Sequence, residues 1–475
     1  MKDTIVLYPS PGISHIVSMV ELAKLIIHHS NHYFSITILL ITSNLWNSPT
    51  IASNINNISQ SHPSISFRRF PPVSVDPTPP RSYPAMVFET ILLNKPYVLD
   101  FLQEIKKERK ICSFIIDMFC TSALSLGKQL KVPTYYYFTS GAACLGAFLY
   151  FPRVHNLYKE KKSFIDLKET VLDFPHMPPL KAIHVPGPML KRDDPAYNDM
   201  LYYCSCLPKS DGIIINTFPD LEPNATKKIE DGLCVEDAKT PPLYCVGPVI
   251  SRNTGKKEPK DYCLSWLDMQ PRKSVVFLCF GSRGSFSIEQ VKEIANGLEK
   301  SGERFLWVVK NPPLDDRKQT EVLIDFDLEA ILPEGFLNRV KDRGLVVKFW
   351  APQMDVLIHD SVGGFVTHCG WSSVIEAVVT GVPMLAWPLY AEQHLNRNAL
   401  VEDMKMAIGV EQRDEDGFVT GDELAKRVRE LMNSDKGREL RERSIEMKEK
   451  NVSVWAESGS SITALTRLVD LWRQG

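Results

Sequence analysis

Short apolar segments alternate with longer amphipathic ones along this chain, and the alternation occurs in two separate blocks. The apolar runs read as buried strands: TIVLY, FSITILLI, CSFIIDMF and VPTYYYF in the first block, then SVVFLCF, RFLWVV, GLVVKF, GGFVTH and VPMLAW in the second. Between them lie segments with helical periodicity, such as IVSMVELAKLIIHH and SIEQVKEIANGLEKSG. Parallel strands joined by crossover helices produce this pattern. The sequence therefore predicts an α/β protein with two doubly wound sheets.

A length of 475 residues supports two domains, since a single core rarely grows beyond about 250–300 residues. The segment GPVISRNTGKKEPKDY, residues 247–262, is polar and contains Pro, Gly and Lys, so it is predicted to be the linker. We expect an N-terminal domain over 1–246, a C-terminal domain over 263–450, and a tail helix within 451–475 that packs back on the N-terminal domain. Two sheets that face each other leave a cleft lined by the carboxyl ends of their strands, where such folds bind ligands.

The composition argues against several classes of partner. The formal net charge is −2 and 24% of the residues are charged, so nothing indicates a nucleic-acid surface or a polybasic membrane patch. Ten cysteines without a Cys-x-x-Cys pair indicate reduced thiols, and the first residues do not resemble a secretory signal, so we expect a cytosolic protein. We also expect it to be a monomer that acts on small molecules. The apolar stretch 135–151 is divided by Thr139 and Ser140, which favours a buried strand, an N-cap and a helix over a membrane span.

The stretch FVTHCGWSSVIEAV, residues 365–378, runs from an apolar strand into a helical segment. A helix that starts at this junction presents unpaired backbone N–H groups and the positive end of its dipole, which together form an anion site. His368, Ser372 and Ser373 add side-chain donors, and Glu376 lies about one turn into the helix, where its carboxylate could accept hydrogen bonds from a vicinal diol. A phosphate and a ribose together indicate a nucleotide. The alternative is a capping box, from Ser373 to Glu376, that only starts the helix.

A longer match favours the nucleotide. Residues 350–393, WAPQMDVLIHDSVGGFVTHCGWSSVIEAVVTGVPMLAWPLYAEQ, resemble the plant secondary-product glycosyltransferase box of the family-one UDP-dependent glycosyltransferases. The forms YPSPGISHIVSMVELAK and LCFGSRGSF resemble the flavonoid-using branch of that family. Further segments extend the resemblance over the whole chain: YPSPGISH, DGIIINTF, CLSWLDMQPRKSVVFLCFGSRG and ESGSS. The resemblance implies a GT-B fold, in which two Rossmann-like domains face each other across a cleft. The N-terminal domain would bind the acceptor and the C-terminal domain the UDP-sugar.

The resemblance assigns the donor site residue by residue. The ring of Trp350 would stack on uracil, and the rest of the nucleoside would meet Ala351, Gln353 and Glu376, with the carboxylate of Glu376 on the ribose hydroxyls. The diphosphate would lie among His368, Ser373 and Ser282. The sugar or its phosphate would meet Trp371, Ser372, Glu392 and Gln393. Taken singly, the two tryptophans could be core residues, and residues 392–393 could be an exposed helix start.

The reaction also needs a base, because a phenol or alcohol must lose its proton as it attacks the anomeric carbon. His15 follows a Pro/Gly loop after the first predicted strand, and the resemblance implies that it is this base. Asp117 ends another predicted strand of the same sheet and would hold the imidazole and stabilise its cation. Taken alone, His15 could be a loop or cap residue, and Asp117 could be a buried aspartate that caps a helix.

The implied reaction is a single in-line displacement, so that an α-linked UDP-glucose donor gives a β-glucoside by inversion. No metal or other cofactor is expected, since the helix N-terminus and the side-chain donors balance the charge of the leaving diphosphate. Asp325 and Asp327 form an Asp-x-Asp pattern like that of metal-dependent glycosyltransferases, which we interpret as a chance match. By resemblance, Gln393 favours glucose over galactose, and Trp371 favours glucose over glucuronic acid.

The acceptor is expected to be a flat apolar phenolic such as a flavonoid or chalcone. Aromatic and aliphatic side chains suited to such a pocket gather in residues 86–102, 139–151 and 195–206. Three positions depart from the usual family residues: Ser14, Ser372 and Glu392. The alternatives are C-glycosylation of an activated aromatic ring, formation of a glucose ester, and a catalytically silent protein that binds a small molecule.

Overall fold

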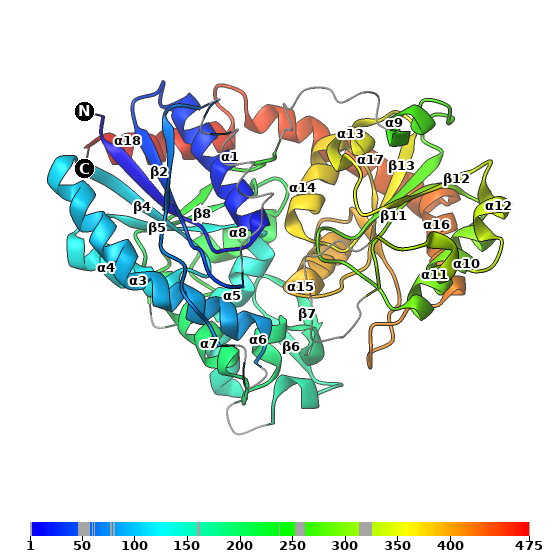
Figure 1. Ribbon diagram of the computed structural model, residues 1–475, viewed down its shortest axis with the longest axis horizontal. Helices are drawn as coiled ribbons and strands as arrows, with labels where there is room; N and C mark the ends of the chain where they lie inside the picture. The colour runs from blue at the N-terminus through cyan, green and yellow to red at the C-terminus, as the bar shows by residue number, and fades with distance from the viewer. Residues whose placement is uncertain are drawn as a thin grey trace. The chain divides into compact units, whose positions relative to one another are not determined.

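The computed structural model describes residues 2–45, 58, 60, 62–76, 78, 81–158, 162–236, 238–251, 262–312 and 325–474. Its contacts divide the chain into two compact units: unit 1 comprises Met1–Ser251 with Ser453–Gly475, and unit 2 comprises Arg252–Val452. Each unit is a parallel sheet covered by helices (Figure 1). The predicted α/β class with two parallel sheets is confirmed. Residues 252–261 of the expected linker lie outside the described residues.

Unit 1 is built on a parallel sheet of seven strands. In sheet order these are β3 (Ile65–Arg69), β2 (Ser35–Leu40), β1 (Thr4–Tyr8), β4 (Ile111–Asp117), β5 (Thr134–Phe138), β8 (Gly212–Ile215) and β9 (Leu243–Cys245). A separate antiparallel hairpin pairs β6 (Val171–Phe174) with β7 (Met177–Lys181). The order β2-β1-β4 means that the chain leaves β1 on one side for β2 and returns later on the other side as β4.

The helices of unit 1 are α1 (Ile13–His29), α3 (Tyr83–Glu108), α4 (Leu124–Leu130), α5 (Ala142–Leu157), α6 (Gly187–Leu190), α7 (Pro195–Cys206), α8 (Pro223–Glu230) and α18 (Ser460–Gln474). Alternate strand residues, among them Ile5, Leu7 and Ile115, form one core with the buried face of α1 and with α18. The C-terminal helix α18, red in Figure 1, thus lies in unit 1 with α1. Its Trp472 is almost fully buried there.

The apolar stretch 135–151 is divided between β5 and α5, as expected, but the helix start differs from the expectation. The N-cap position is Gly141, not Thr139 or Ser140, and it offers no side-chain cap. The distant Glu222 replaces it, since its buried carboxylate accepts the backbone N–H of Ala142 at 2.7 Å and of Ala143 at 2.9 Å. A carboxylate placed there satisfies orphan donors and complements the helix dipole.

Unit 2 is built on a parallel sheet of six strands. In sheet order these are β12 (Gly344–Lys348), β11 (Arg304–Val309), β10 (Val275–Cys279), β13 (Val362–Thr367), β14 (Met384–Ala386) and β15 (Ala407–Gly409). The helices are α9 (Tyr262–Leu267), α10 (Ile288–Ser301), α11 (Leu328–Ile331), α12 (Phe336–Val340), α13 (Gln353–Ile358), α14 (Trp371–Thr380), α15 (Gln393–Asn398), α16 (Gly421–Asn433) and α17 (Asp435–Val454). The arrangement of β11, β10 and β13 repeats that of β2, β1 and β4.

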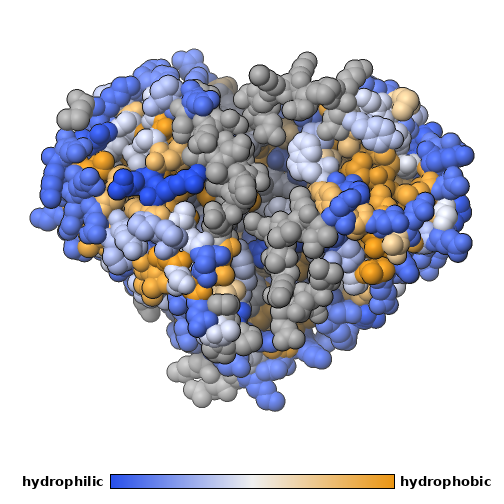
Figure 2. All heavy atoms as spheres, in the orientation of Figure 1, coloured by the Kyte–Doolittle hydropathy of each residue, from blue (hydrophilic) through white to orange (hydrophobic). Residues whose placement is uncertain are grey.

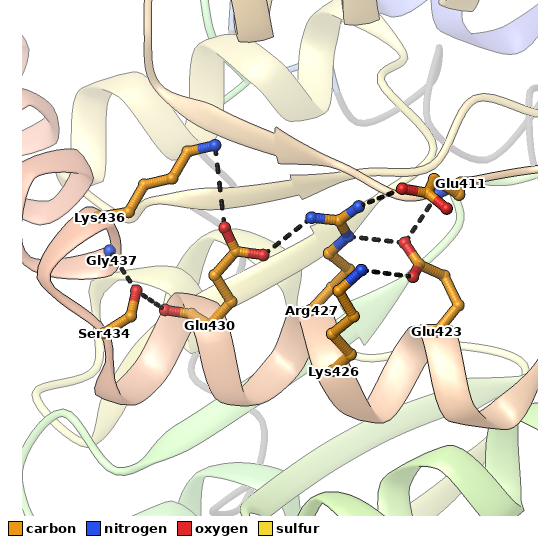
Figure 3. A network of polar contacts seen from close by, with 8 residues as sticks. All are labelled: Glu411, Glu423, Lys426, Arg427, Glu430, Ser434, Lys436 and Gly437. Carbon is orange, nitrogen blue, oxygen red and sulfur yellow. Dashed lines mark hydrogen bonds and ion pairs between the residues drawn. The ribbon is translucent and has the colours of Figure 1, made fainter.

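A network of charged side chains along α16 is centred on Arg427 (Figure 3). Its guanidinium donates to Glu423 at 2.6 Å, to Glu430 at 2.9 Å and to Glu411 at 2.8 Å. Glu411 follows β15 by two residues, so the network ties the end of the sheet to α16. The opposite, apolar face of α16 shares a core with α10 and the strands, and this burial holds the helix more strongly than exposed ion pairs do.

The surface of both units is mostly hydrophilic on the face drawn in Figure 2, and apolar residues are visible there in smaller groups. Exposed large apolar side chains include Leu92 on α3 and Tyr202 on α7. No helix in the described parts of the chain is both long and apolar enough to cross a membrane. All ten cysteines are buried free thiols.

Candidate active site

Each sheet has a point where the direction of chain progression reverses. β1 lies between β2 and β4, and β10 lies between β11 and β13. Because the connections leave such neighbouring strands toward opposite faces, the loops at their carboxyl ends part and leave a crevice for a ligand. In unit 1, His15 follows β1 and Asp117 ends β4; in unit 2, Ser282 follows β10 and His368 follows β13. The residues expected in the site thus gather at both reversal points.

His15 and Asp117 are in direct contact in unit 1. The Nδ1 atom of His15 lies 2.8 Å from Oδ2 of Asp117, and the other carboxylate oxygen accepts the backbone N–H of Phe119 at 3.0 Å. The Asp117 side chain is fully buried, while 19% of the His15 side chain is exposed. With Nδ1–H donating to the carboxylate, the lone pair of the neutral ring lies on Nε2. The pair can therefore accept a proton at Nε2 and stabilise the imidazolium that results.

An aromatic ring packs against His15, and the sequence analysis named the segments of its neighbours Phe88 and Tyr203 but not Phe119 itself. The Phe119 ring lies 5.5 Å from the His15 ring, between centroids. Phe119 in turn packs against Phe88 of α3 at 5.7 Å and against Tyr203 of α7 at 6.1 Å. The position of Phe119, two residues beyond Asp117 at a strand end, is the signal that could have identified it. Phe119 thus places an apolar ring next to the imidazole, and Phe88 and the fully buried Tyr203 pack against Phe119.

His368 is held tightly at the carboxyl end of β13 in unit 2. Its ring packs between two glycines: a Cβ atom added to Gly281 or to Gly370 would lie 2.4 Å from Nε2. Burial, and then the positive charge of Lys310, lowers the pKa of His368 to about 4, so the ring is neutral at physiological pH. Its Nδ1 atom is buried and has no hydrogen-bond partner within the described residues. A neutral imidazole with an unpaired nitrogen is suited to bind a ligand atom.

The start of α14 contradicts the capping-box alternative. The helix begins at Trp371 after the N-cap residue Gly370, whose side chain cannot cap it. Ser373 is therefore the third helical residue and not the N-cap. The N–H groups of the first turn have no partner inside the helix, and they lie beside the ring of His368, which contacts Gly370. The helix terminus offers backbone donors and a positive dipole end to an anion.

Residues expected at the nucleoside and at the diphosphate meet across α13 and α14. The side-chain amide of Gln353 donates to Oγ of Ser373 at 2.9 Å and to Oε2 of Glu376 at 2.6 Å. Burial raises the pKa of the Glu376 carboxyl to about 7, and the hydrogen bond from Gln353 opposes this shift. Near this point Ala351 is buried, whereas Trp350 is 62% exposed. The exposed indole of Trp350 suits stacking on a base, and the carboxyl of Glu376, with its pKa of about 7, suits the hydroxyls of a diol.

Backbone conformations in the left-handed region recur at the loops of this site. Phe349, Cys369 and Ala391 have φ values of +68°, +64° and +55°. They directly precede Trp350, the N-cap of α14 and Glu392. Such conformations cost an L-residue about 1–3 kcal/mol and tend to persist at functional sites, where the surrounding structure holds them.

The remaining expected residues differ in how far they are available to a ligand. Gln393 is buried, and its carbonyl oxygen accepts the backbone N–H of Leu389 at 2.8 Å and of Tyr390 at 3.0 Å, so it fixes the loop after β14. Glu392 is half-buried, 3.5 Å from the Asn396 amide. Trp371 is buried, and its side chain reads as core, while Ser282 and Ser372 are exposed.

Tyr390 links three of these loops, and sequence reasoning missed it. The guanidinium of Arg283, in the loop after β10, lies 5.6 Å from the Tyr390 ring centroid, and the His368 ring lies 6.3 Å from it. Its backbone N–H is held by Gln393. Tyr390 lies two residues before Glu392, inside the segment 350–393 that resembles the glycosyltransferase box, and this position could have identified it. The loops after β10, β13 and β14 are thereby packed into one surface.

The two aspartates of the Asp-x-Asp pattern have other partners. Asp325 forms an ion pair with Lys348, and Asp327 is the N-cap of α11, where its Oδ1 accepts the N–H of Glu329 at 3.0 Å. Both are exposed. Within the described ranges, no group of three or more His, Cys, Asp or Glu residues is arranged to hold a metal ion.

Comparisons with known proteins agree with this geometry. Residues 250–442 match the model of a family described as "UDP-glucoronosyl and UDP-glucosyl transferase". UDP-glycosyltransferase 88F3 of Pyrus communis is 58% identical, and a phloretin 2'-O-glucosyltransferase of Malus domestica is 57% identical, each over 99% of both chains. Among solved structures, Phytolacca americana UGT2 in complex with UDP-2-fluoro-glucose and pterostilbene has a TM-score of 0.88 and 36% identity, over 99% of this chain and 100% of that one.

Two glycine variants test how His368 is held. Gly281 and Gly302 have φ values of +72° and +78°, so an alanine is strained by about 1–2 kcal/mol at either position. An added Cβ meets His368 only at Gly281, since nothing lies within 4 Å at Gly302. We expect Gly281→Ala to lower stability by about 1–3 kcal/mol more than Gly302→Ala, as measured by thermal unfolding. Equal losses would show that the ring does not pack against this turn.

Proposed function

This chain belongs to the UDP-glycosyltransferase family and has its two-domain GT-B fold, and on that premise we propose that it transfers glucose from UDP-glucose to a hydroxyl of a flat phenolic acceptor. The product is a β-glucoside, formed with inversion. The observation that carries the proposal is the contact between His15 and the buried carboxylate of Asp117, since it supplies the base that the transfer needs. In this proposal, unit 1 binds the acceptor and unit 2 binds the donor.

The proposed chemistry proceeds in one displacement. The Nε2 atom of His15 takes the proton of the acceptor hydroxyl as its oxygen attacks the anomeric carbon. The carboxylate of Asp117 keeps Nδ1 protonated and stabilises the imidazolium, as in other carboxylate–histidine pairs. The bond between the anomeric carbon and the diphosphate breaks as the new bond forms, and UDP leaves. The intact pair argues against a catalytically silent binder.

The donor is proposed to lie along the loops of unit 2. Uracil stacks on the exposed indole of Trp350, beside Ala351, and the ribose hydroxyls donate to Glu376, which Gln353 orients. The diphosphate binds at the N-terminus of α14, with the side chains of His368, Ser373 and Ser282 as donors. The sugar or its phosphate is bound near Trp371, Ser372, Glu392 and Gln393. Fixed donors of this kind neutralise the leaving group without a metal ion.

The acceptor is proposed to be an apolar phenolic such as a flavonoid, a chalcone or a related compound. The ring of Phe119 beside His15, which packs against Phe88, supports this choice, because flat rings pack well against an aromatic side chain. The name of the Malus domestica relative, a phloretin 2'-O-glucosyltransferase, and the pterostilbene complex of the Phytolacca americana enzyme support it as well. The ten buried free thiols support a reducing, cytosolic location.

A panel of aglycones tests this function. The purified protein is incubated with UDP-glucose and phloretin, pterostilbene, a flavonol or a benzoic acid, with and without EDTA, and the products are identified by mass spectrometry. We expect phenolic O-glucosides that are released by acid hydrolysis, and turnover that survives EDTA. Acid-resistant products would indicate C-glycosylation, and alkali-labile products from the benzoic acid alone would indicate glucose esters. Activity that manganese restores after EDTA would contradict the metal-free mechanism.

The pKa of Glu376 predicts how nucleoside binding depends on pH. Ribose hydroxyls donate to the ionised carboxylate, and burial sets the pKa of this carboxyl to about 7. Raising the pH therefore increases the binding-competent form, and the affinity for uridine should rise by about tenfold from about pH 6 to about pH 8. Uridine is chosen over UDP because it has no phosphate to titrate, and calorimetry gives the affinity. In Glu376→Gln the pH dependence should vanish; if it persists, another group binds the ribose.

Variants of the catalytic pair test the base. We expect His15→Ala to lower kcat for a weakly acidic phenol by roughly 10²–10⁴-fold, as loss of a positioned base does. Asp117→Asn keeps the shape but removes the charge, and it should also slow turnover. The double variant should be less impaired than the product of the two effects, because both residues support one proton transfer. Uridine affinity serves as the control and should not change in any of them. Independent, fully additive effects would contradict the pairing.

A further inference from the structure

Lys310 is a positively charged residue that has no role in the reaction described so far. It follows β11 directly, and its partly buried ammonium group donates a hydrogen bond to the backbone carbonyl of Gly281. Burial lowers the pKa of Lys310, and the neighbouring Cys279 opposes the shift. A cation that is withdrawn from water is costly unless a negative charge compensates it.

No carboxylate provides that charge within the described residues. The ion pairs formed there by other lysines of unit 2 show the contrast: Lys300 pairs with Asp422 at 2.8 Å, and Lys348 pairs with Asp325. Lys348 lies beside Val309 in the sheet register, one residue from Lys310, and yet it has a carboxylate partner. The charge of Lys310 is thus left to be balanced by something other than a described side chain.

The position of Lys310 relates it to the proposed diphosphate site. The carbonyl that it binds belongs to Gly281, the residue that packs against the ring of His368. The same ring packs against Gly370, the N-cap of α14. The charge of Lys310 also acts on this ring, where it adds to the effect of burial in lowering the pKa of His368. A continuous series of contacts therefore runs from Lys310 through the turn after β10 and His368 to the N-terminus of α14.

We propose that Lys310 supplies the fixed positive charge of the diphosphate site: it holds the Gly281 turn in place and stabilises the diphosphate of UDP, both when the donor binds and when UDP leaves. The inference rests on the proposed function, because it names a residue of that same donor site. It assigns Lys310 a positioning and electrostatic role and does not require that the ammonium touch the substrate.

The magnitudes favour this role. His368 is neutral, so it offers a hydrogen bond but no charge. The N-terminus of a helix is equivalent to about half an elementary charge, whereas a lysine carries a whole one. A leaving diphosphate gains negative charge in the transition state, and a fixed cation in a partly desolvated place stabilises it without reorganisation. Lys310 is therefore expected to contribute more than the dipole of α14.

The test compares UDP with uridine, which differ only in the diphosphate. In calorimetric titrations, Lys310→Met should bind UDP about tenfold to a hundredfold more weakly than the wild type, while its uridine affinity stays the same. Lys310→Gln can still donate to the Gly281 carbonyl but has no charge, and it should show the same selective loss. Lys310→Arg should recover most of the UDP affinity. Lys300→Met, which removes one positive charge from an exposed pair in the same unit, is the matched control and should leave both affinities unchanged.

Two outcomes would overturn the proposal. If Lys310→Gln keeps the wild-type ratio of UDP to uridine affinity, the charge has no role at the diphosphate. If UDP and uridine are weakened equally in a folded Lys310→Met protein, the residue only supports the pocket. Should Lys310→Met fail to fold, the Gln and Arg variants still decide the question. These outcomes differ from a failure of the proposed function itself, which would appear as a wild-type protein that does not transfer glucose or does not prefer UDP to uridine.

Discussion

The buried carboxylate of Asp117 is the constraint on which the proposed chemistry depends. A carboxylate that is removed from water has to be hydrogen-bonded, and Asp117 meets this need with the backbone N–H of Phe119 and with the His15 ring. The second bond fixes the tautomer and the direction of the imidazole. It can form only because β1 and β4 are parallel neighbours, so that the first turn of α1 and the last residue of β4 meet. The sheet order thus prepares the base before an acceptor arrives.

The same topology gives the second unit a different use. At the reversal between β10 and β13, unit 2 provides a helix terminus, a neutral imidazole and backbone held in left-handed conformations. These features are polar without being acidic, which suits a polyanion such as a nucleoside diphosphate. The positive charge comes from Lys310 in our account, and the carboxylate of Glu376 is set apart for the ribose. In the proposed mechanism, the two copies of this fold therefore separate proton transfer from the binding of the leaving group.

Local signals in the sequence predicted nine strands, β1, β2, β4, β5 and β10 to β14, and placed His15 after the first strand and Asp117 at the end of another; the short strands β3, β6 to β9 and β15 were not predicted. Apolar runs of limited length and periodic segments are sufficient for that. What they could not predict are partners far apart in the chain: Glu222 caps a helix that begins about eighty residues earlier, and nothing in its surroundings indicates this. The capping box at Ser373 was a plausible local pattern, but the helix begins before it. Lys310 looks like an ordinary lysine after a strand, because its significance lies in having no carboxylate partner among the side chains that the structure describes.

The dependence of turnover on the acidity of the acceptor tests the central claim most directly. A series of phenols of similar shape and increasing pKa is glucosylated by the wild type and by His15→Ala, and log kcat is plotted against the phenol pKa. If His15 removes the proton, the wild-type plot is shallow, and the variant plot falls steeply as the phenol becomes less acidic, because an already ionised phenol needs no base. The two lines then converge for the most acidic phenols. Parallel lines would contradict the account, since they would mean that His15 does not act on the proton.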